Sequence, residues 1–317
     1  MQDNWPAAQI TWIIGKTEAS LMADIPEIEF IIFDKSKGRH AYADVRAQLN
    51  GREFDVALCM HASMRANFLC RIVHSPIRLG FDRVRARDFQ WLFTNRKIPA
   101  ATGEHALEAM MSFATVIGAA PRSMRWDIPL DDRARRFAEE FASNGKPFVV
   151  ISPCSSQRSR NFRDWSIDKY AATIRHLRDK GCRVVLTGGP SERERAYGKA
   201  LATDGAADNL VGMTSLKELV ALIDSADLII CPDSGPAHMA TAVSTPVLGL
   251  YATTNPNRSG PFVCRELIVN RYPDAAHKFL GKSPDQLRWG QRVRHSDAMD
   301  LITIEDVTDK IDAFFDT

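Results

Sequence analysis

The residues best suited to bind an anion lie in short loops that directly follow apolar runs. Residues 227–231 form one such run, and Asp233, Ser234 and Gly235 separate it from a helical pattern. Ser234 or Asp233 can cap that helix, and Gly235 lets a ligand approach the backbone. The open N–H groups and the positive dipole end of such a helix form an anion site, to which His238 can add a donor. The alternative is a plain helix cap without a ligand.

A second loop follows the run 147–152 and is rich in hydroxyl and guanidinium groups. Its serines, Ser155 and Ser156, can hydrogen-bond to phosphate oxygens. Its arginines can bind phosphate through a bidentate fork, and they are Arg158, Arg160 and Arg163. The alternative interpretation is a solvated basic loop that contacts only water.

A third loop, residues 188–192, follows the run 182–187 and combines glycines with Glu192. A carboxylate there can accept hydrogen bonds from ribose hydroxyls, or it can simply favour the helix dipole. Three consecutive strand–loop–helix junctions thus present polar groups at one edge, which suits a nucleoside diphosphate. Asp233 has no DxD partner, so we expect no metal ion and no other cofactor, and we expect guanidinium groups and the helix dipole to neutralise the phosphates.

An alternation of β-branched runs and helical patterns must position these loops. Strand-like runs recur along the chain, at residues 9–15, 28–34, 54–60, 147–152, 182–187, 227–231 and 246–251. Segments with 3.6-residue apolar spacing lie between several of them, for example 40–49, 166–180, 192–201 and 216–223. This alternation predicts an α/β protein with parallel sheets, in which ligands bind beyond the carboxyl ends of the strands.

This alternation breaks between residues 122 and 146, a stretch that Pro121, Pro129 and Pro147 punctuate. We therefore predict two domains of ordinary size, residues 1–130 and 131–317, with the ligand site in a cleft between their sheets. The last amphipathic stretch, 304–315, can pack back onto the first half.

Composition excludes several classes of protein. The 317 residues are 45% apolar and 25% charged, as in ordinary globular proteins. The 41 basic and 39 acidic residues leave a net charge of +2, which argues against a dedicated nucleic-acid binder. No apolar run approaches the roughly 20 residues that span a bilayer. The six cysteines are scattered without metal-ligand spacing, so we interpret them as small buried apolar residues of a cytoplasmic protein.

The chain resembles the ADP-heptose:lipopolysaccharide heptosyltransferases, which are inverting glycosyltransferases of family 9 with a GT-B fold. The most specific motif is Pro232-Asp-Ser-Gly-Pro-Ala-His238, followed by Gly249-Leu-Tyr-Ala-Thr253. Weaker matches run over nearly the whole chain, and they include residues 10–15, 78–82, 93–97, 188–192 and 212–214. The resemblance implies two Rossmann-like domains whose parallel sheets face each other across a cleft.

The resemblance also implies roles for individual residues. Asp233, facing the donor sugar, and Arg160, on the phosphates, are the expected catalytic groups. Glu192 is expected at the ribose, and Met213 or Thr214 at the adenine. The remaining donor-binding residues surround the pyrophosphate, and they are Ser155, Ser156, Arg158, Ser234, Gly235 and His238.

One departure from the family concerns the first strand. Relatives begin with a strand, a Gly-Asp loop that supplies the proposed catalytic base, and a helix, ahead of the segment that corresponds to residues 10–15. This chain starts a few residues before that segment. We therefore expect the first βα unit to be absent, and the chain to bind ADP yet transfer sugar weakly or not at all. A non-catalytic nucleotide-binding remnant, or a relative using another nucleotide sugar, is the alternative.

Basic and aromatic residues in the first half suggest where an acceptor binds. His61 and Arg65 follow the run 54–60, and Arg83 and Arg96 lie in a span that also holds aromatic side chains. This composition suits an anionic, amphipathic acceptor such as a lipid A–Kdo core, with peripheral contact at the inner membrane face. The alternative is a salt-bridged surface, and the total charge disfavours nucleic acid.

Overall fold

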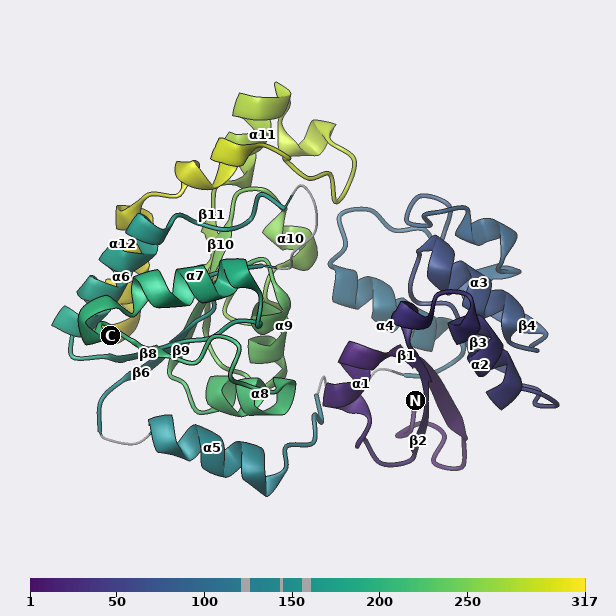
Figure 1. Cartoon of the computed structure of the whole chain (residues 1–317). Helices are drawn as coiled ribbons and strands as arrows, with labels where there is room; N and C mark the ends of the chain where they lie inside the picture. Colours follow the sequence, from purple (N-terminus) through teal and green to yellow (C-terminus); the bar gives the residue numbers. More distant parts are fainter. Residues whose placement is uncertain (121–125, 143–144, 156–160, 317) are drawn as a thin grey trace. The chain divides into compact units, whose positions relative to one another are not determined.

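The computed structural model describes residues 1–120, 126–142, 145–155 and 161–316, and it divides the chain into two compact units. The units are Met1–Pro129 and Leu130–Thr317 (Figure 1), whereas the sequence prediction placed the division after residue 130. No helix within the described ranges is long and apolar enough to span a membrane.

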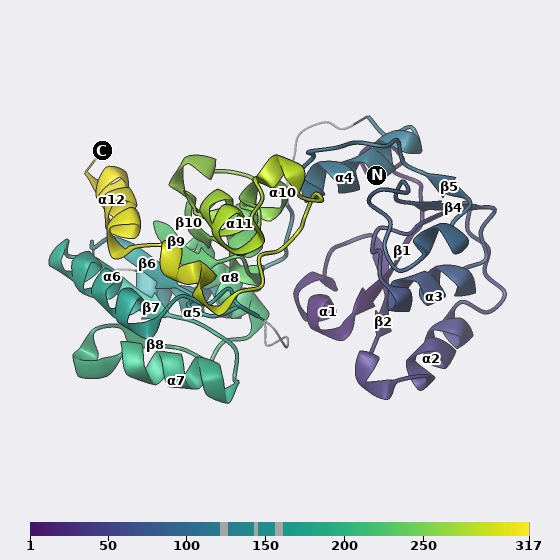
Figure 2. The same ribbon diagram turned by 90° about the horizontal axis from the view of Figure 1, so that it is seen from above.

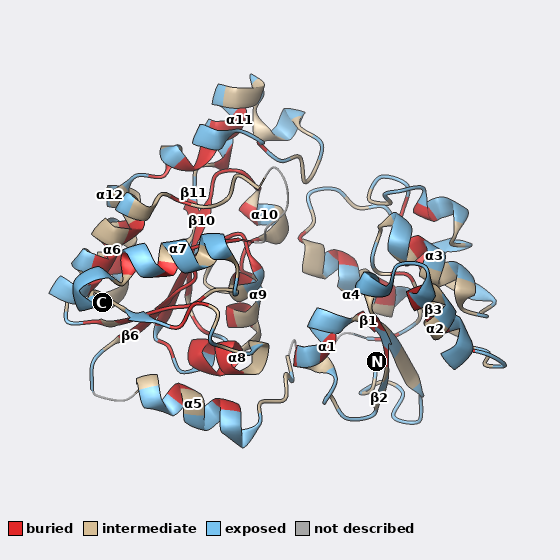
Figure 3. Cartoon of the chain, viewed as in Figure 1, coloured by how far each residue is buried: buried red, intermediate tan, exposed pale blue. Residues whose placement is uncertain are grey.

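The second unit is built on a parallel sheet with the strand order β11-β10-β9-β6-β7-β8. Its strands are β6 (Phe148–Ile151), β7 (Arg183–Leu186), β8 (Asp208–Asn209), β9 (Leu228–Pro232), β10 (Val247–Tyr251) and β11 (Val269–Asn270). Every residue of β6, β9 and β10 is buried (Figure 3). A parallel sheet covered on both faces needs such continuous apolar strands, which is why these runs were recognisable in the sequence.

Helices cover both faces of this sheet. One face packs against α6 (Ile167–Asp179), α7 (Glu192–Leu201), α11 (Tyr272–Leu280) and α12 (Ile304–Phe315). The other packs against α5 (Asp132–Ala142), α8 (Leu216–Asp224) and α9 (Gly235–Ala242). Within β6, Val149 and Ile151 face the first layer, whereas Phe148 and Val150 face the second. The alternation along one strand therefore serves two apolar cores.

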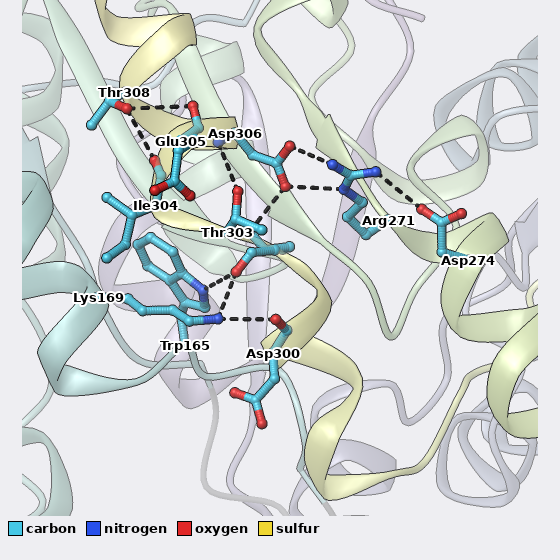
Figure 4. A network of polar contacts seen from close by, with 11 residues as sticks. Trp165, Lys169, Arg271, Asp274, Asp300, Thr303, Ile304, Glu305, Asp306 and Thr308 are labelled. Carbon is cyan, nitrogen blue, oxygen red and sulfur yellow. Dashed lines mark hydrogen bonds and ion pairs between the residues drawn. The ribbon is translucent and has the colours of Figure 1, made fainter.

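The C-terminal helix α12 packs against α6 within the second unit, and the two lie side by side in Figures 1 and 2. Polar contacts fix the segment that leads into α12 (Figure 4): the Trp165 indole donates to the Ile302 carbonyl at 3.1 Å. Arg271 binds both carboxylate oxygens of Asp306, at 3.0 and 2.5 Å. The apolar face of α12, which the sequence analysis considered for packing on the first half, is thus buried against its own unit.

The first unit contains two parallel sheets. β1 (Ile10–Gly15) pairs with β2 (Ile28–Phe33), and the order β3-β4-β5 joins Val56–Leu58, Ile77–Gly80 and Arg96–Lys97. Its helices are α1 (Lys16–Met22), α2 (His40–Gln48), α3 (Met64–Ile72) and α4 (Ala106–Val116). Within the described part, β1 and β3 each pair along one edge only, and Trp12 and Ile32 on one face of the first sheet are 40% and 47% exposed.

All seven predicted strands are present as β1, β2, β3, β6, β7, β9 and β10. The sequence analysis did not predict β4, β5, β8 and β11. Two of these have a polar or charged pair as their only residues, so they lack an apolar run. The remaining short helices are α10 (Pro256–Ser259) and 3-10 turns at Lys35–Lys37, Gln90–Leu92, Thr203–Gly205, Arg265–Leu267, Pro284–Gln286 and Ser296–Leu301.

Candidate active site

The site lies where the strand order of the second sheet reverses direction. β6 and β9 are neighbours, and the chain continues from β6 towards β7 on one side and from β9 towards β10 on the other. Loops that leave such a pair diverge, and ligands of open parallel sheets bind beyond the carboxyl ends of the strands at such a point. The two loops that sequence analysis singled out, after β6 and after β9, flank this point.

The start of α9 presents N–H groups that no side chain of the described residues caps. Ser234 occupies the N-cap position with an extended backbone, but its hydroxyl donates to the Pro232 carbonyl at 3.0 Å. The prediction that Ser234 or Asp233 caps the helix is therefore wrong. Gly235 is exposed, and among the described residues no atom beyond its chain neighbours and the backbone of its own helix lies within 4 Å of a Cβ placed on it. An anion can therefore approach the first turn of α9 closely.

Arg163 fixes Asp233 beside this helix start. Its Nη1 donates to the Asp233 carbonyl at 2.7 Å and lies 3.4 Å from the carboxylate, while its Nε donates to the Asn161 amide oxygen at 3.0 Å. The side chains of Arg163 and Asp233 are only 14% and 8% exposed. Arg163 thus ties the loop after β6 to the loop after β9.

A buried carboxylate organises the loop after β6. Asp164 accepts hydrogen bonds from the amide and hydroxyl of Ser155, at 2.8 and 2.7 Å, and pairs with Arg193 at 2.7 Å. Asn161 also donates to the Ser155 hydroxyl at 2.6 Å. Ser155 is accordingly buried and already hydrogen-bonded, with one lone pair of its oxygen left for a ligand. Ser156, Arg158 and Arg160 lie outside the described residues.

Two hydroxyls, one on the last residue of β10 and one just beyond this strand, lack a partner in the described part of the chain. Tyr251 and Thr254 are almost fully buried, and neither hydroxyl oxygen has a hydrogen-bond partner among the described residues. Burial raises the pKa of Tyr251 well above 10, and the charge of Asp233 raises it further, so the phenol stays protonated beside that carboxylate. Buried hydroxyls without partners are uncommon in proteins, and here they mark a place that a polar ligand can satisfy. Sequence analysis missed both roles, because Tyr and Thr are ordinary strand residues.

Two glutamates follow the glycines of the third loop, and they have different surroundings. The Glu194 carboxylate accepts from the Gly189 amide at 2.7 Å, and the Glu194 backbone amide donates to the Ser191 hydroxyl that caps α7, at 3.3 Å. Glu192 is exposed, and no partner is found for it in the described part of the chain. Its carboxylate is therefore available to a ligand, in keeping with the predicted ribose contact.

The loop after β8 lies against the third loop. Gly212 donates to the Gly188 carbonyl at 2.8 Å, and a Cβ on Gly212 would come within 3.0 Å of the Pro190 Cα. The next residue, Met213, is 67% exposed, and Thr214 is half-buried. An apolar side chain thus stands free beside the loop that carries Glu192.

His238 lies in the first turn of α9 and is exposed. Desolvation by the surrounding protein lowers the pKa of its imidazole below 6.5, while the charge of Asp233 opposes this shift. The ring is therefore mainly neutral near pH 7, and it offers one N–H donor rather than a positive charge.

The four predicted acceptor residues are all exposed on the first unit. His61 and Arg65 flank the N-terminus of α3, Arg83 lies over the Trp91 ring at 5.1 Å, and Arg96 lies on β5. No ion pair is found for these arginines within the described ranges, so the salt-bridged surface considered above is not formed by them.

Comparison with known proteins shows to which family the chain belongs. The family model described as glycosyltransferase family 9 (heptosyltransferase) matches residues 42–286. The chain belongs to this family. It is 34% identical over 309 residues to the lipopolysaccharide core heptosyltransferase OpsX of Haemophilus influenzae, covering 97% of this chain and 88% of OpsX. The resemblance read from the sequence is therefore confirmed, and the chain is a glycosyltransferase of the heptosyltransferase family.

Solved structures confirm the fold class. A family 9 glycosyltransferase from Veillonella parvula aligns with a TM-score of 0.77 at 19% identity, covering 100% of this chain and 91% of that one. The E. coli heptosyltransferase WaaC with ADP aligns with a TM-score of 0.72 at 19% identity, covering 99% and 92%. The predicted α/β class, with parallel sheets of the GT-B type, is thus confirmed.

Proposed function

We propose that this family 9 enzyme transfers a heptose from ADP-heptose to the inner core of lipopolysaccharide, with inversion and without a metal ion. The observation that carries the proposal is the uncapped start of α9 beside Asp233, at the point where the strand order reverses. Solved relatives support the donor, because WaaC has been crystallised with ADP and with ADP-2-deoxy-2-fluoro heptose. The name of OpsX supports the acceptor.

The groups at the sheet edge suit the parts of an ADP-sugar. The open N–H groups of α9 bind the diphosphate, Glu192 binds the ribose, and Met213 and Thr214 adjoin the adenine. Tyr251 and Thr254 hold hydroxyls that the sugar can satisfy. Ser155 contacts the pyrophosphate through its remaining lone pair, and Arg160, Arg158 and Ser156 complete the phosphate contacts in our proposal.

The reaction is a direct displacement at the anomeric carbon. A new bond forms between the acceptor oxygen and this carbon, the bond to the phosphate oxygen breaks, and the electron pair leaves with ADP. The acceptor hydroxyl gives its proton to solvent water. The helix start stabilises the negative charge that develops on ADP, and the Asp233 carboxylate stabilises positive charge on the sugar. Each charge-assisted hydrogen bond to the leaving phosphate contributes about 1.5–3 kcal/mol.

A transfer assay tests this proposal. The chain is incubated with ADP-heptose and a Kdo-containing lipid acceptor, and the product is followed by mass spectrometry and by NMR of the anomeric configuration. Asp233→Asn should lower turnover at least about 100-fold, whereas Asp168→Asn, an exposed first-turn carboxylate on α6, should not. Binding of ADP without transfer would favour a non-catalytic nucleotide-binding protein. Equal use of other nucleotide sugars would refute the assignment of ADP-heptose as the donor.

A further inference from the structure

An ion pair joins the loop after β6 to the start of α7. It runs from the Asp164 carboxylate to the Arg193 guanidinium at 2.7 Å, a charge contact without the alignment of a hydrogen bond. The hydroxyl of Tyr197, one turn further along α7, donates to the Trp165 carbonyl at 3.0 Å. Two neighbouring residues of the loop thus contact two successive turns of the helix.

Packing holds the end of α7, whereas its start is exposed. The residues that α7 buries, Gly198 and Leu201, lie in its second half. A Cβ on Gly198 would come within 2.6 Å of the Asn209 side chain, so this half of the helix packs closely against β8. The first turn carries the exposed Glu192 and Arg193. Polar contacts must therefore fix the position of this turn.

Several polar contacts of the first turn stay within the third loop. The Glu194 carboxylate accepts from the Gly189 amide, and Arg195 donates to the Pro190 carbonyl at 3.0 Å. These bonds hold the turn and its own loop together. Arg193, in contrast, reaches across to the loop after β6. Its ion pair therefore relates two loops that are far apart in the chain.

These two loops carry the two subsites of the proposed donor site. On one side, the Asp164 carboxylate binds the amide and the hydroxyl of Ser155, at 2.8 and 2.7 Å. On the other side, Arg193 directly follows Glu192 in the chain. The proposed function assigns Ser155 to the diphosphate and Glu192 to the ribose. The ion pair thus links the residues of one subsite to those of the other.

The burial of the pair favours a positioning role over a stabilising one. The Arg193 side chain is 46% exposed, and ion pairs with an exposed partner contribute little to the stability of a fold. The Asp164 side chain is only 1% exposed and is held by Ser155, so it offers Arg193 a fixed partner. A fixed spacing of two subsites lowers the cost of ordering the protein around a ligand that contacts both.

We propose that the Asp164–Arg193 pair sets the spacing between the diphosphate and ribose subsites. It thereby selects a ligand in which the two groups are joined, a nucleoside 5′-diphosphate. The inference rests on the proposed function, which places the two subsites. Asp164 and Arg193 are positioning residues, because they act through Ser155 and Glu192. Their loss should weaken the binding of ADP, which spans both subsites, but not of adenosine or inorganic diphosphate, each of which occupies one.

The affinities of the full chain for these three ligands test this inference. Calorimetry measures ADP, and ligand-observed NMR measures adenosine and inorganic diphosphate. Arg193→Met should weaken ADP binding roughly tenfold, and it should change the affinity for the two smaller ligands less than about twofold. Arg193→Lys keeps the charge and should restore part of the ADP affinity. In a chain that already carries Asp164→Asn, Arg193→Met should change ADP binding less than about twofold.

Arg195→Met is the matched control, because Arg195 is an exposed arginine of the same helix that contacts only its own loop in the bond described above. It should bind all three ligands as the unaltered chain does. Equal losses of ADP and diphosphate in Arg193→Met would mean that Arg193 binds the phosphates itself, and they would overturn the inference. An unchanged ADP affinity, or an equal loss in Arg195→Met, would overturn it as well.

The failure of the proposed function has a different signature. If the unaltered chain binds ADP but Arg193→Met has no effect, only the positioning role is lost. If the unaltered chain does not bind ADP, the proposed function fails and this inference fails with it.

Discussion

Replacement of Arg163 by methionine tests whether one side chain couples the two central loops of the site. The variant keeps a long side chain but loses the bonds to the Asp233 carbonyl and to Asn161, at 2.7 and 3.0 Å. Two hydrogen bonds from a charged donor, at about 1.5–3 kcal/mol each, predict a loss of about 3–6 kcal/mol in the free energy of unfolding. The contact at 3.4 Å to the Asp233 carboxylate adds little on geometric grounds. Both side chains are mostly buried, so solvent screening reduces this loss only modestly.

Urea unfolding followed by circular dichroism gives this free energy, and calorimetry gives the ADP affinity of the same variant. Arg163→Lys keeps the charge but not the fork of donors, so we expect about half of the loss. Arg195→Met is the control, because Arg195 is exposed and donates one hydrogen bond to the Pro190 carbonyl at 3.0 Å. It should cost about 1 kcal/mol or less. If Arg163→Met and Arg195→Met unfold at the same urea concentration, the coupling role is refuted.

Three further predictions concern pH, the third loop and metal ions. Hydrogen bonding, chiefly from Arg52, lowers the pKa of Glu29 from 4.5 to about 2, so its contribution to stability is present above pH 4.5 and is lost as the pH falls towards 2. Glu29→Gln should weaken the dependence of the free energy of unfolding on pH in that window. An acid transition unchanged by the substitution would contradict this prediction. Glu192→Ala should weaken ADP binding at an unchanged melting temperature. Glu194→Ala should lower the melting temperature, because it removes the acceptor of the Gly189 amide and of the Ser191 hydroxyl, and the reverse pattern would exclude our assignment. Heptose transfer should persist in EDTA. A loss of transfer in EDTA that added Mg²⁺ reverses would disprove a metal-independent reaction.

The central strands of the second unit were predictable, and its edges were not. The runs 147–152 and 246–251 contain β-branched residues and are buried on both faces as β6 and β10. Their apolar sequence is therefore enough to predict a strand without knowledge of the neighbouring strands. In contrast, Asp208 and Asn209 form β8 only because β7 lies beside them. Pairing of such short polar segments depends on a neighbour far along the chain, and no local pattern reports it.

The residues of the candidate site were likewise predictable only in part. Asp233 and Ser234 stand out in the sequence because turn residues follow an apolar strand directly. Asp164 resembles any acidic residue ahead of a helix, yet it is buried and holds Ser155 in place. The cap predicted for Ser234 fails because a nearer acceptor, the Pro232 carbonyl, takes its hydroxyl. Sequence spacing identified which loops meet, and only the structure shows which atoms pair.

A crystal structure of this chain with ADP tests the central claim most directly. The account predicts diphosphate oxygens within about 3 Å of the Gly235 and Ala237 amides, the first free donors of α9. It also predicts the ribose beside Glu192. A diphosphate bound away from the carboxyl ends of β6 and β9 would contradict the account.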